Sequence, residues 1–357
     1  MLKTIIKIEI VILVLALLAG GVLYAISAGV LDLFEDPVTV EYNPLPIATD
    51  APTEATEPEE TEPVTEQTAP VETQPQETEP TAPPPTDPVT GEPIPTEPRA
   101  ITATKYFVYD VRDGEYLQKV GNETEKLYPA SITKLLTCYV VLQHLKPEET
   151  VVAGDALMLV PEDSSVAGIL EGDKLTVEQL IAAMMLPSGN DAAQIAAVTA
   201  GRRIAQNESL PPENAVDVFM NEMNVQAEAL GMENSHFVTP DGFHRDNHYT
   251  TMDDLIILCQ KVLAEPVILK YASRASDAVI LPDRVLEWKN TNLLLHPESE
   301  CYLPNTIGLK TGYTDAAGGC LVTAFFEEDR LLLIGVFGAT AYTTDRYLDT
   351  VDIYNSI

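Results

Sequence analysis

A serine and a lysine stand three residues apart at the start of an apolar, helix-forming stretch. Ser131 and Lys134 belong to the sequence Pro-Ala-Ser-Ile-Thr-Lys, and on a helix this spacing places the hydroxyl and the amine on one face. A serine hydroxyl becomes a good nucleophile when a base removes its proton, and a lysine amine becomes that base when a dry pocket and a neighbouring cation lower its pKa. The backbone N–H of Ser131, near the helix start, can also stabilise an oxyanion. The pair predicts acyl transfer, although on its own it is more typical of a solvated helix surface.

A second set of polar groups lies in the sequence Pro-Ser-Gly-Asn at residues 187–190, between two helix-forming stretches. From a loop at this point, the Ser188 hydroxyl can pass a proton to a leaving amine. The Asn190 amide can hold both the substrate and the side chain of Lys134. The alternative interpretation of this segment is an ordinary turn that caps a helix.

A third set, Lys310-Thr311-Gly312, immediately precedes an apolar strand, so we expect it at the edge of a sheet. Lys310 there should stay charged, attract a substrate carboxylate and depress the pKa of Lys134. Gly312 should leave the edge open for an extended peptide. A Lys-Thr-Gly turn that arises by chance is the alternative.

The stretches around these residues predict an α+β domain, because strands stand at both ends and helices between them. A hairpin should open the domain, with strands at 106–110 and 115–120 around a turn at 112–114. Apolar residues recur at helical spacing in 132–145, 174–185 and 252–263. Strands at 319–326 and 331–337, joined by a polar turn at 327–330, and a helix at 345–354 should close it.

The three motifs in this order resemble the Ser-x-x-Lys, Ser-x-Asn and Lys-Thr-Gly set of penicillin-binding proteins and serine β-lactamases. The likeness covers most of residues 100–354 and is greatest to the low-molecular-weight D-Ala-D-Ala carboxypeptidases. It implies the β-lactamase/transpeptidase-like fold, an antiparallel sheet flanked by helices with a helical insertion. It also implies that Thr311 binds substrate, that the Tyr313 N–H is the second oxyanion donor, and that Arg346 lies near the substrate carboxylate. A surface position on the last helix is the alternative for Arg346. Thr291 departs from relatives that carry an arginine there.

The resemblance implies a serine carboxypeptidase that removes the terminal D-alanine from peptidoglycan stem peptides through an acyl-enzyme and is inhibited by covalent β-lactam binding. Two alternatives stay open: a serine β-lactamase, and a penicillin or wall sensor without useful turnover. A Glu-x-x-Leu-Asn segment, which class A β-lactamases use for deacylation, does not occur between Asn190 and Lys310. Preference among carboxypeptidase, endopeptidase and transpeptidase work is also open.

Neither a cofactor nor a metal is expected. His244 and His248 stand four residues apart, with His236 nearby, but no acidic or cysteine pattern completes a metal site around them. A net charge of −34 argues against nucleic acid as a partner. The four cysteines, Cys138, Cys259, Cys301 and Cys320, allow three disulfide connectivities. Because Cys138 and Cys259 lie in apolar runs, we expect buried thiols instead.

The N-terminal part predicts export. Residues 10–30 are apolar and uncharged, and a helix of that length is ~31 Å long, enough to cross a bilayer. Lysines precede it and acidic residues follow it, which places the N-terminus in the cytoplasm and the rest outside. We expect an anchor over 1–34, with a cleaved signal peptide as the alternative. The N-terminal anchor should replace the C-terminal anchor that relatives carry. Residues 35–98 hold sixteen acidic residues and no lysine or arginine in a Pro/Thr/Glu-rich pattern, which predicts a disordered linker before the catalytic domain at 99–357.

Overall fold

The domain is built on a five-stranded antiparallel sheet. The computed structural model describes residues 99–327, 329–340 and 344–357, and its main sheet has the strand order β2-β1-β9-β8-β7. The strands are β1 Lys105–Asp110, β2 Glu115–Val120, β7 Thr306–Thr314, β8 Gly318–Glu327 and β9 Arg330–Ala339. The first and last strands along the chain meet in the middle of the sheet, so both ends of the domain are fixed by one set of pairings.

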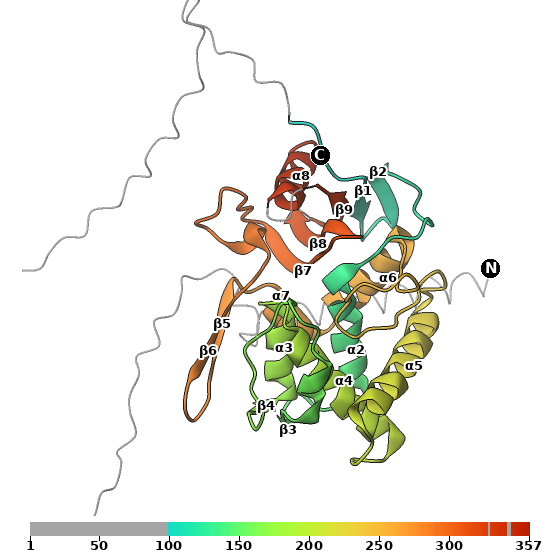
Figure 1. Ribbon diagram of the computed structural model, residues 1–357. Helices are drawn as coiled ribbons and strands as arrows, with labels where there is room; N and C mark the ends of the chain where they lie inside the picture. The colour runs from blue at the N-terminus through green and yellow to red at the C-terminus, as the bar shows by residue number, and fades with distance from the viewer. Residues whose placement is uncertain (1–98, 328, 341–343) are drawn as a thin grey trace, which may run out of the picture. The chain divides into compact units, whose positions relative to one another are not determined.

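The two faces of the sheet are covered by different elements (Figure 1). Side chains alternate between faces along each strand: Cys320 and Val322 of β8 join the main core under the helices, whereas Leu321 and Phe325 join a second cluster. Helix α8, Asp345–Tyr354, covers that second cluster with Tyr347 and Ile353.

The helical part lies on the opposite face and is built around α2. Helix α2, Lys134–His144, follows a short 3₁₀ turn at Ala130–Thr133 and is buried along its whole first half, so the turn that carries Ser131 leads directly into the core. The surrounding helices are α3 Val177–Met185, α4 Asn190–Ala205, α5 Pro212–Leu230, α6 Met252–Leu263 and α7 Pro266–Ala272. This arrangement is the expected antiparallel sheet with a helical insertion.

The segment that leads into β1 is fastened to α8. Asp349, whose side chain is fully buried, accepts hydrogen bonds from Thr102 N (3.1 Å), Ala103 N (2.8 Å) and Thr102 Oγ1 (2.9 Å). Arg99 adds an ion pair to Asp349 at 2.5 Å and another to Asp352 at 3.1 Å. The chain therefore enters the domain along the last helix.

Most elements lie where the sequence predicts them, and α6, α8 and β2 have the expected bounds. The helix predicted at 174–185 is wrong at its start, because Lys174–Thr176 forms strand β4, paired with β3, Thr150–Val152. Thr176 then caps α3 in a reciprocal capping box with Gln179. A hairpin of β5, Ser276–Ile280, and β6, Val285–Lys289, was not predicted.

The predicted anchor and linker lie outside the described residues. Within the part of the chain that the structure describes, no helix has the length and hydropathy needed to span a membrane.

Candidate active site

The three predicted motifs meet at one cleft of about 540 Å³. Ser131 comes from the 3₁₀ turn before α2, Ser188 and Asn190 from the junction of α3 and α4, and Thr311 to Tyr313 from the edge strand β7. Arg346 of α8 also lines the cleft. Segments more than 200 residues apart in the sequence therefore contribute to one site.

Lys134 is placed to act on Ser131. Its Nζ lies 2.9 Å from Ser131 Oγ and also donates to Asn190 Oδ1 (2.7 Å) and to the Asp241 carbonyl oxygen (2.8 Å). The Lys134 side chain is fully buried, and burial lowers its pKa to about 8, although the carboxylates of Asp241 and Asp191 favour the ammonium form. An amine with this pKa can take up a proton near neutral pH.

Ser188 faces the second lysine. Lys310 Nζ lies 3.0 Å from Ser188 Oγ and 3.0 Å from the Thr311 carbonyl oxygen. The backbone of Ser188 is left-handed, with φ at 62°, a conformation that a residue other than glycine adopts at some cost and that is common at functional sites. Ser188 therefore lies in a loop between α3 and α4, as the sequence predicts, and has an unusual backbone conformation there.

Lys310 lies on an edge strand as expected, but its side chain is not open to solvent. The edge strand is β7, and the Lys310 side chain there is only 1% exposed. Burial lowers its pKa well below the usual value, and the neighbouring cations Lys134 and Arg346 lower it further. The motif lies within β7, which directly precedes the predicted strand, β8.

Gly312 lies where β7 passes close to the turn that carries Ser131. A Cβ at this position would lie 2.9 Å from the Pro129 carbonyl oxygen and 3.0 Å from Ser131 N. The missing side chain therefore allows β7 to approach the turn that carries Ser131, and this close approach sets the distance between two walls of the cleft.

Arg346 is a buried residue of the cleft, so the alternative of a surface arginine is wrong. It is 8% exposed, and its guanidinium donates to the Gly312 carbonyl oxygen at 2.6 Å. Thr311 Oγ1 lies 2.6 Å from Thr291 Oγ1, so the position where some relatives carry an arginine contacts the third motif directly. Tyr313 lines the cleft beside them.

Sequence reasoning missed Asp241. Its carbonyl oxygen accepts from Lys134, and its carboxylate accepts from Gln194 Nε2 at 3.1 Å and from Phe243 N at 2.8 Å. Asp241 lies in the segment 230–244, whose similarity to the relatives was the available signal. No spacing rule links it to Ser131, because the contact exists only after folding.

The histidines of that region have structural partners. His248 is buried and lies 2.8 Å from Thr133 Oγ1 through Nε2, while its Nδ1 accepts from Val238 N at 3.2 Å. Burial lowers the pKa of His248 to about 3, so it stays neutral. Among the described residues, no group of three or more metal-ligand side chains is assembled.

Fold and site together define a penicillin-binding protein of the active-serine type. More narrowly, the chain belongs to the D-alanyl-D-alanine carboxypeptidase family, whose sequence profile matches residues 92–341.

Individual relatives agree with this family. D-alanyl-D-alanine carboxypeptidase DacF of Bacillus subtilis is 28% identical over 224 residues, which cover 61% of this chain and 53% of the relative. DacD of Escherichia coli is 30% identical over 254 residues, which cover 68% of this chain and 60% of the relative. The chain thus spans between half and two thirds of the length of these curated relatives.

Solved structures share the fold. The crystal structure of the Streptomyces K15 DD-transpeptidase matches with a TM-score of 0.63 at 28% identity, covering 72% of this chain and 97% of that one. Penicillin-binding protein 6B from Escherichia coli matches with a TM-score of 0.59 at 28% identity, covering 73% of this chain and 78% of that one.

Proposed function

We propose that this protein is a serine D-Ala-D-Ala carboxypeptidase that removes the terminal D-alanine from peptidoglycan stem peptides. The observation that carries the proposal is the contact between Ser131 Oγ and the buried Lys134 Nζ at 2.9 Å, opposite a Ser188–Lys310 pair in the same cleft. A nucleophile with its own base on one side and a proton donor on the other is the arrangement that amide cleavage requires.

In the first step, neutral Lys134 takes the proton of Ser131, and Oγ attacks the carbonyl carbon between the two D-alanines. The backbone N–H groups of Ser131 and Tyr313 stabilise the oxyanion. The C–N bond then breaks, and the proton that Lys134 took up reaches the leaving amine by relay through the Ser188 hydroxyl, so that Lys134 returns to its neutral form. D-alanine departs, water attacks the acyl-enzyme, and the shortened peptide is released. β-Lactams enter by the same attack and remain as a slowly hydrolysed acyl group.

The substrate carboxylate affects this step through its charge, because it binds close to Lys310 and Arg346. A carboxylate bound at Thr311 and Arg346 raises the pKa of the adjacent Lys310, because an opposite charge favours the ammonium form. Lys134 and Lys310 repel each other when both are charged, so an ammonium group at Lys310 favours the neutral Lys134 amine that Ser131 requires.

The test compares the parent chain with Ser131→Ala in two assays: D-alanine release from diacetyl-L-Lys-D-Ala-D-Ala, and labelling by a fluorescent penicillin. We expect the parent to be active in both and the variant in neither. Penicillin hydrolysis with fast turnover and no D-alanine release would indicate a β-lactamase. Stable labelling by penicillin, with neither penicillin hydrolysis nor D-alanine release, would indicate a sensor. Persistent labelling of Ser131→Ala would contradict the nucleophile assignment.

We also propose that residues 1–34 anchor the protein in the cell membrane, with the N-terminus in the cytoplasm and the catalytic domain outside. The support is the apolar, uncharged run at 10–30 and the charge bias around it. The acidic linker at 35–98 then acts as a spacer between the membrane and the domain. Fractionation of cells should place the full chain in the membrane pellet. Recovery of a shortened chain from the medium would indicate a cleaved signal peptide.

A further inference from the structure

One wall of the cleft is an irregular segment that includes Asp163, Ser164 and Ser165. It is bonded directly to the second motif. Asn190 N donates to the Ser165 carbonyl oxygen at 2.8 Å, and Ser165 Oγ donates to the Ser188 carbonyl oxygen at 2.9 Å. The position of this segment, which we call the wall (residues 163–169), therefore affects where Ser188 and Asn190 lie.

Asp191, the residue after the second motif, binds the backbone of the wall through its carboxylate. Its carboxylate accepts from Ala167 N at 2.8 Å through Oδ1 and from Ile169 N at 3.1 Å through Oδ2. Asp191 is 2% exposed, and within the described residues its carboxylate forms no ion pair with a lysine, arginine or histidine. Burying a carboxylate is costly unless hydrogen bonds replace its water. The backbone N–H groups of the wall provide that replacement, so carboxylate and wall stabilise each other.

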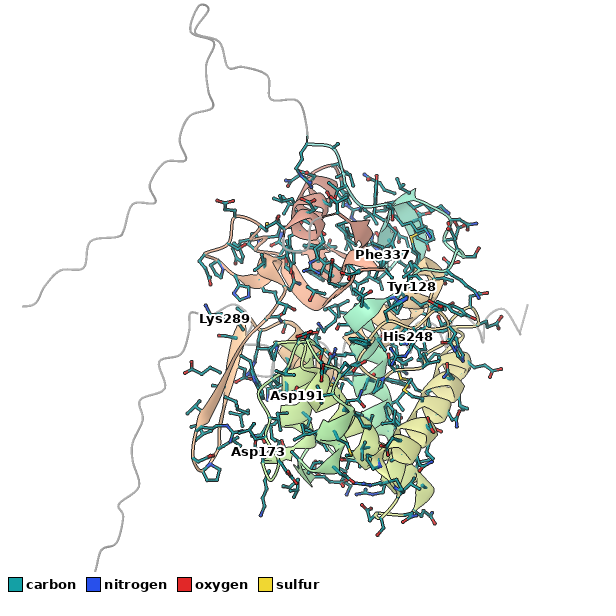
Figure 2. The ribbon with its side chains drawn as sticks, viewed as in Figure 1. Tyr128, Asp173, Asp191, His248, Lys289 and Phe337 are labelled. Carbon is teal, nitrogen blue, oxygen red and sulfur yellow. The ribbon has the colours of Figure 1, made fainter. Side chains whose placement is uncertain are left out.

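The β5–β6 hairpin also binds the wall, through hydrogen bonds to its backbone carbonyl oxygens. Trp288 Nε1 donates to the Ala167 carbonyl oxygen at 2.8 Å. Arg284 pairs with Asp173, just beyond the wall, and donates to the Gly168 carbonyl oxygen at 3.3 Å. In Figure 2 Asp173 lies beside this hairpin, whereas Asp191 lies at the start of α4. Ala167 thus has its N–H fixed by one element and its carbonyl oxygen by another.

We propose that Asp191 is a positioning residue of the acyl-transfer site, which, with Trp288, fixes the wall and through it the Ser188 hydroxyl and the Asn190 amide. The inference rests on the proposed function. Asp191 acts on the reaction through a second route as well, because its negative charge lies close enough to Lys134 to favour the ammonium form of that base. The other titratable groups that influence the pKa of Lys134 are Asp241 and Cys138, and Lys134 in turn lowers the pKa of Lys310.

The two routes can be separated with two variants of the full chain. Asp191→Asn keeps the shape but places an amide N–H against backbone N–H groups, and it removes the charge. Trp288→Phe keeps the aromatic ring and removes only the donor to Ala167. Asp217→Asn, on the exposed face of α5, is the matched control for loss of one negative charge. Each variant is assayed for penicillin acylation between pH 6 and 10 and for D-alanine release.

Both Asp191→Asn and Trp288→Phe should lower the acylation rate, by about 10-fold to 100-fold for Asp191→Asn. Only Asp191→Asn should move the rise of the rate with pH to lower pH, because loss of a carboxylate lowers the pKa of Lys134. Asp217→Asn should change neither. Parental acylation rates in both variants would overturn the proposal, and so would an unmoved pH profile in Asp191→Asn. If Asp191→Asn does not fold, a parental rate in Trp288→Phe is sufficient to overturn it. A parent that is acylated by penicillin but releases no D-alanine contradicts the proposed function and leaves this comparison intact.

Discussion

At the scale of single residues, the site is governed by two lysines that share one buried region. Lys134 and Lys310 are both withdrawn from solvent, and burial lowers the pKa of both. The nearby carboxylates of Asp241 and Asp191 favour the ammonium form of Lys134, whereas the charges of Lys134 and Arg346 disfavour that of Lys310. The pKa of Lys134 thus depends on its surroundings and not on its position on the helix alone.

The pH dependence of acylation follows from this tuning. In the proposed reaction Lys134 acts as the neutral amine, so the rate of penicillin acylation should rise with pH through about 8, the pKa of Lys134. Lys134→Arg keeps the positive charge and removes the base, and should lower the rate on the order of 10²-fold to 10⁴-fold at all pH values. A near-parental rate in Lys134→Arg would exclude this residue as the base.

Gly312→Ala tests the close approach of β7 to Ser131. The added Cβ would meet backbone atoms of Pro129 and Ser131 at 2.9 and 3.0 Å, so the strand must move away from the nucleophile. We expect acylation to fall by about 10²-fold, as for other misplacements near 1 Å. Gly154→Ala is the control, because a Cβ there meets nothing within 4 Å. Equal acylation rates in the two variants would contradict the role given to Gly312.

At the scale of elements, the sequence predicted the bounds of an element correctly where nearby residues determine where it begins and ends. Helix α6 begins at a Thr251 cap and has one apolar face, and its bounds were predicted correctly. The β5–β6 hairpin was missed because its strands are short and are stabilised by distant partners, such as Trp288 on Ala167. The three motifs could be predicted as one site, but the burial of Lys310 and the contact of Asp241 with Lys134 depend on packing between remote segments. Such contacts leave no pattern in a single sequence.

The fastening of residues 99–103 to α8 predicts a sharp limit for truncation. A chain that begins at Arg99 retains every donor to Asp349 and should be folded and acylated by penicillin. A chain that begins at Thr104 leaves the Asp349 carboxylate without those donors and should lose about 1–3 kcal/mol of unfolding free energy. Urea unfolding of the two chains measures the difference. Equal stability would mean that this contact contributes nothing.

At the scale of the whole molecule, the four cysteines are distributed through the cores and none is at the surface. All are buried free thiols, and burial raises the pKa of each. Because the thiolate is the reactive form, the folded protein should tolerate an oxidising compartment without forming disulfides.

Thiol titration checks this expectation. The native protein should react slowly with an aromatic disulfide reagent, and the unfolded protein should release four equivalents, one for each cysteine in the chain. Fewer than four equivalents after unfolding without reductant would show that cysteines had paired. Fast reaction of the native protein would contradict the burial of the thiols.

The attachment at Asp349 also determines where a mechanical load enters the domain. Tension on the chain before Arg99 is transmitted to α8 through the bonds of Arg99, Thr102 and Ala103. Arg346 stands three residues earlier on the same helix and holds the Gly312 carbonyl oxygen at the cleft. Tension on the chain before Arg99 would therefore act on the same helix that places Arg346 in the cleft.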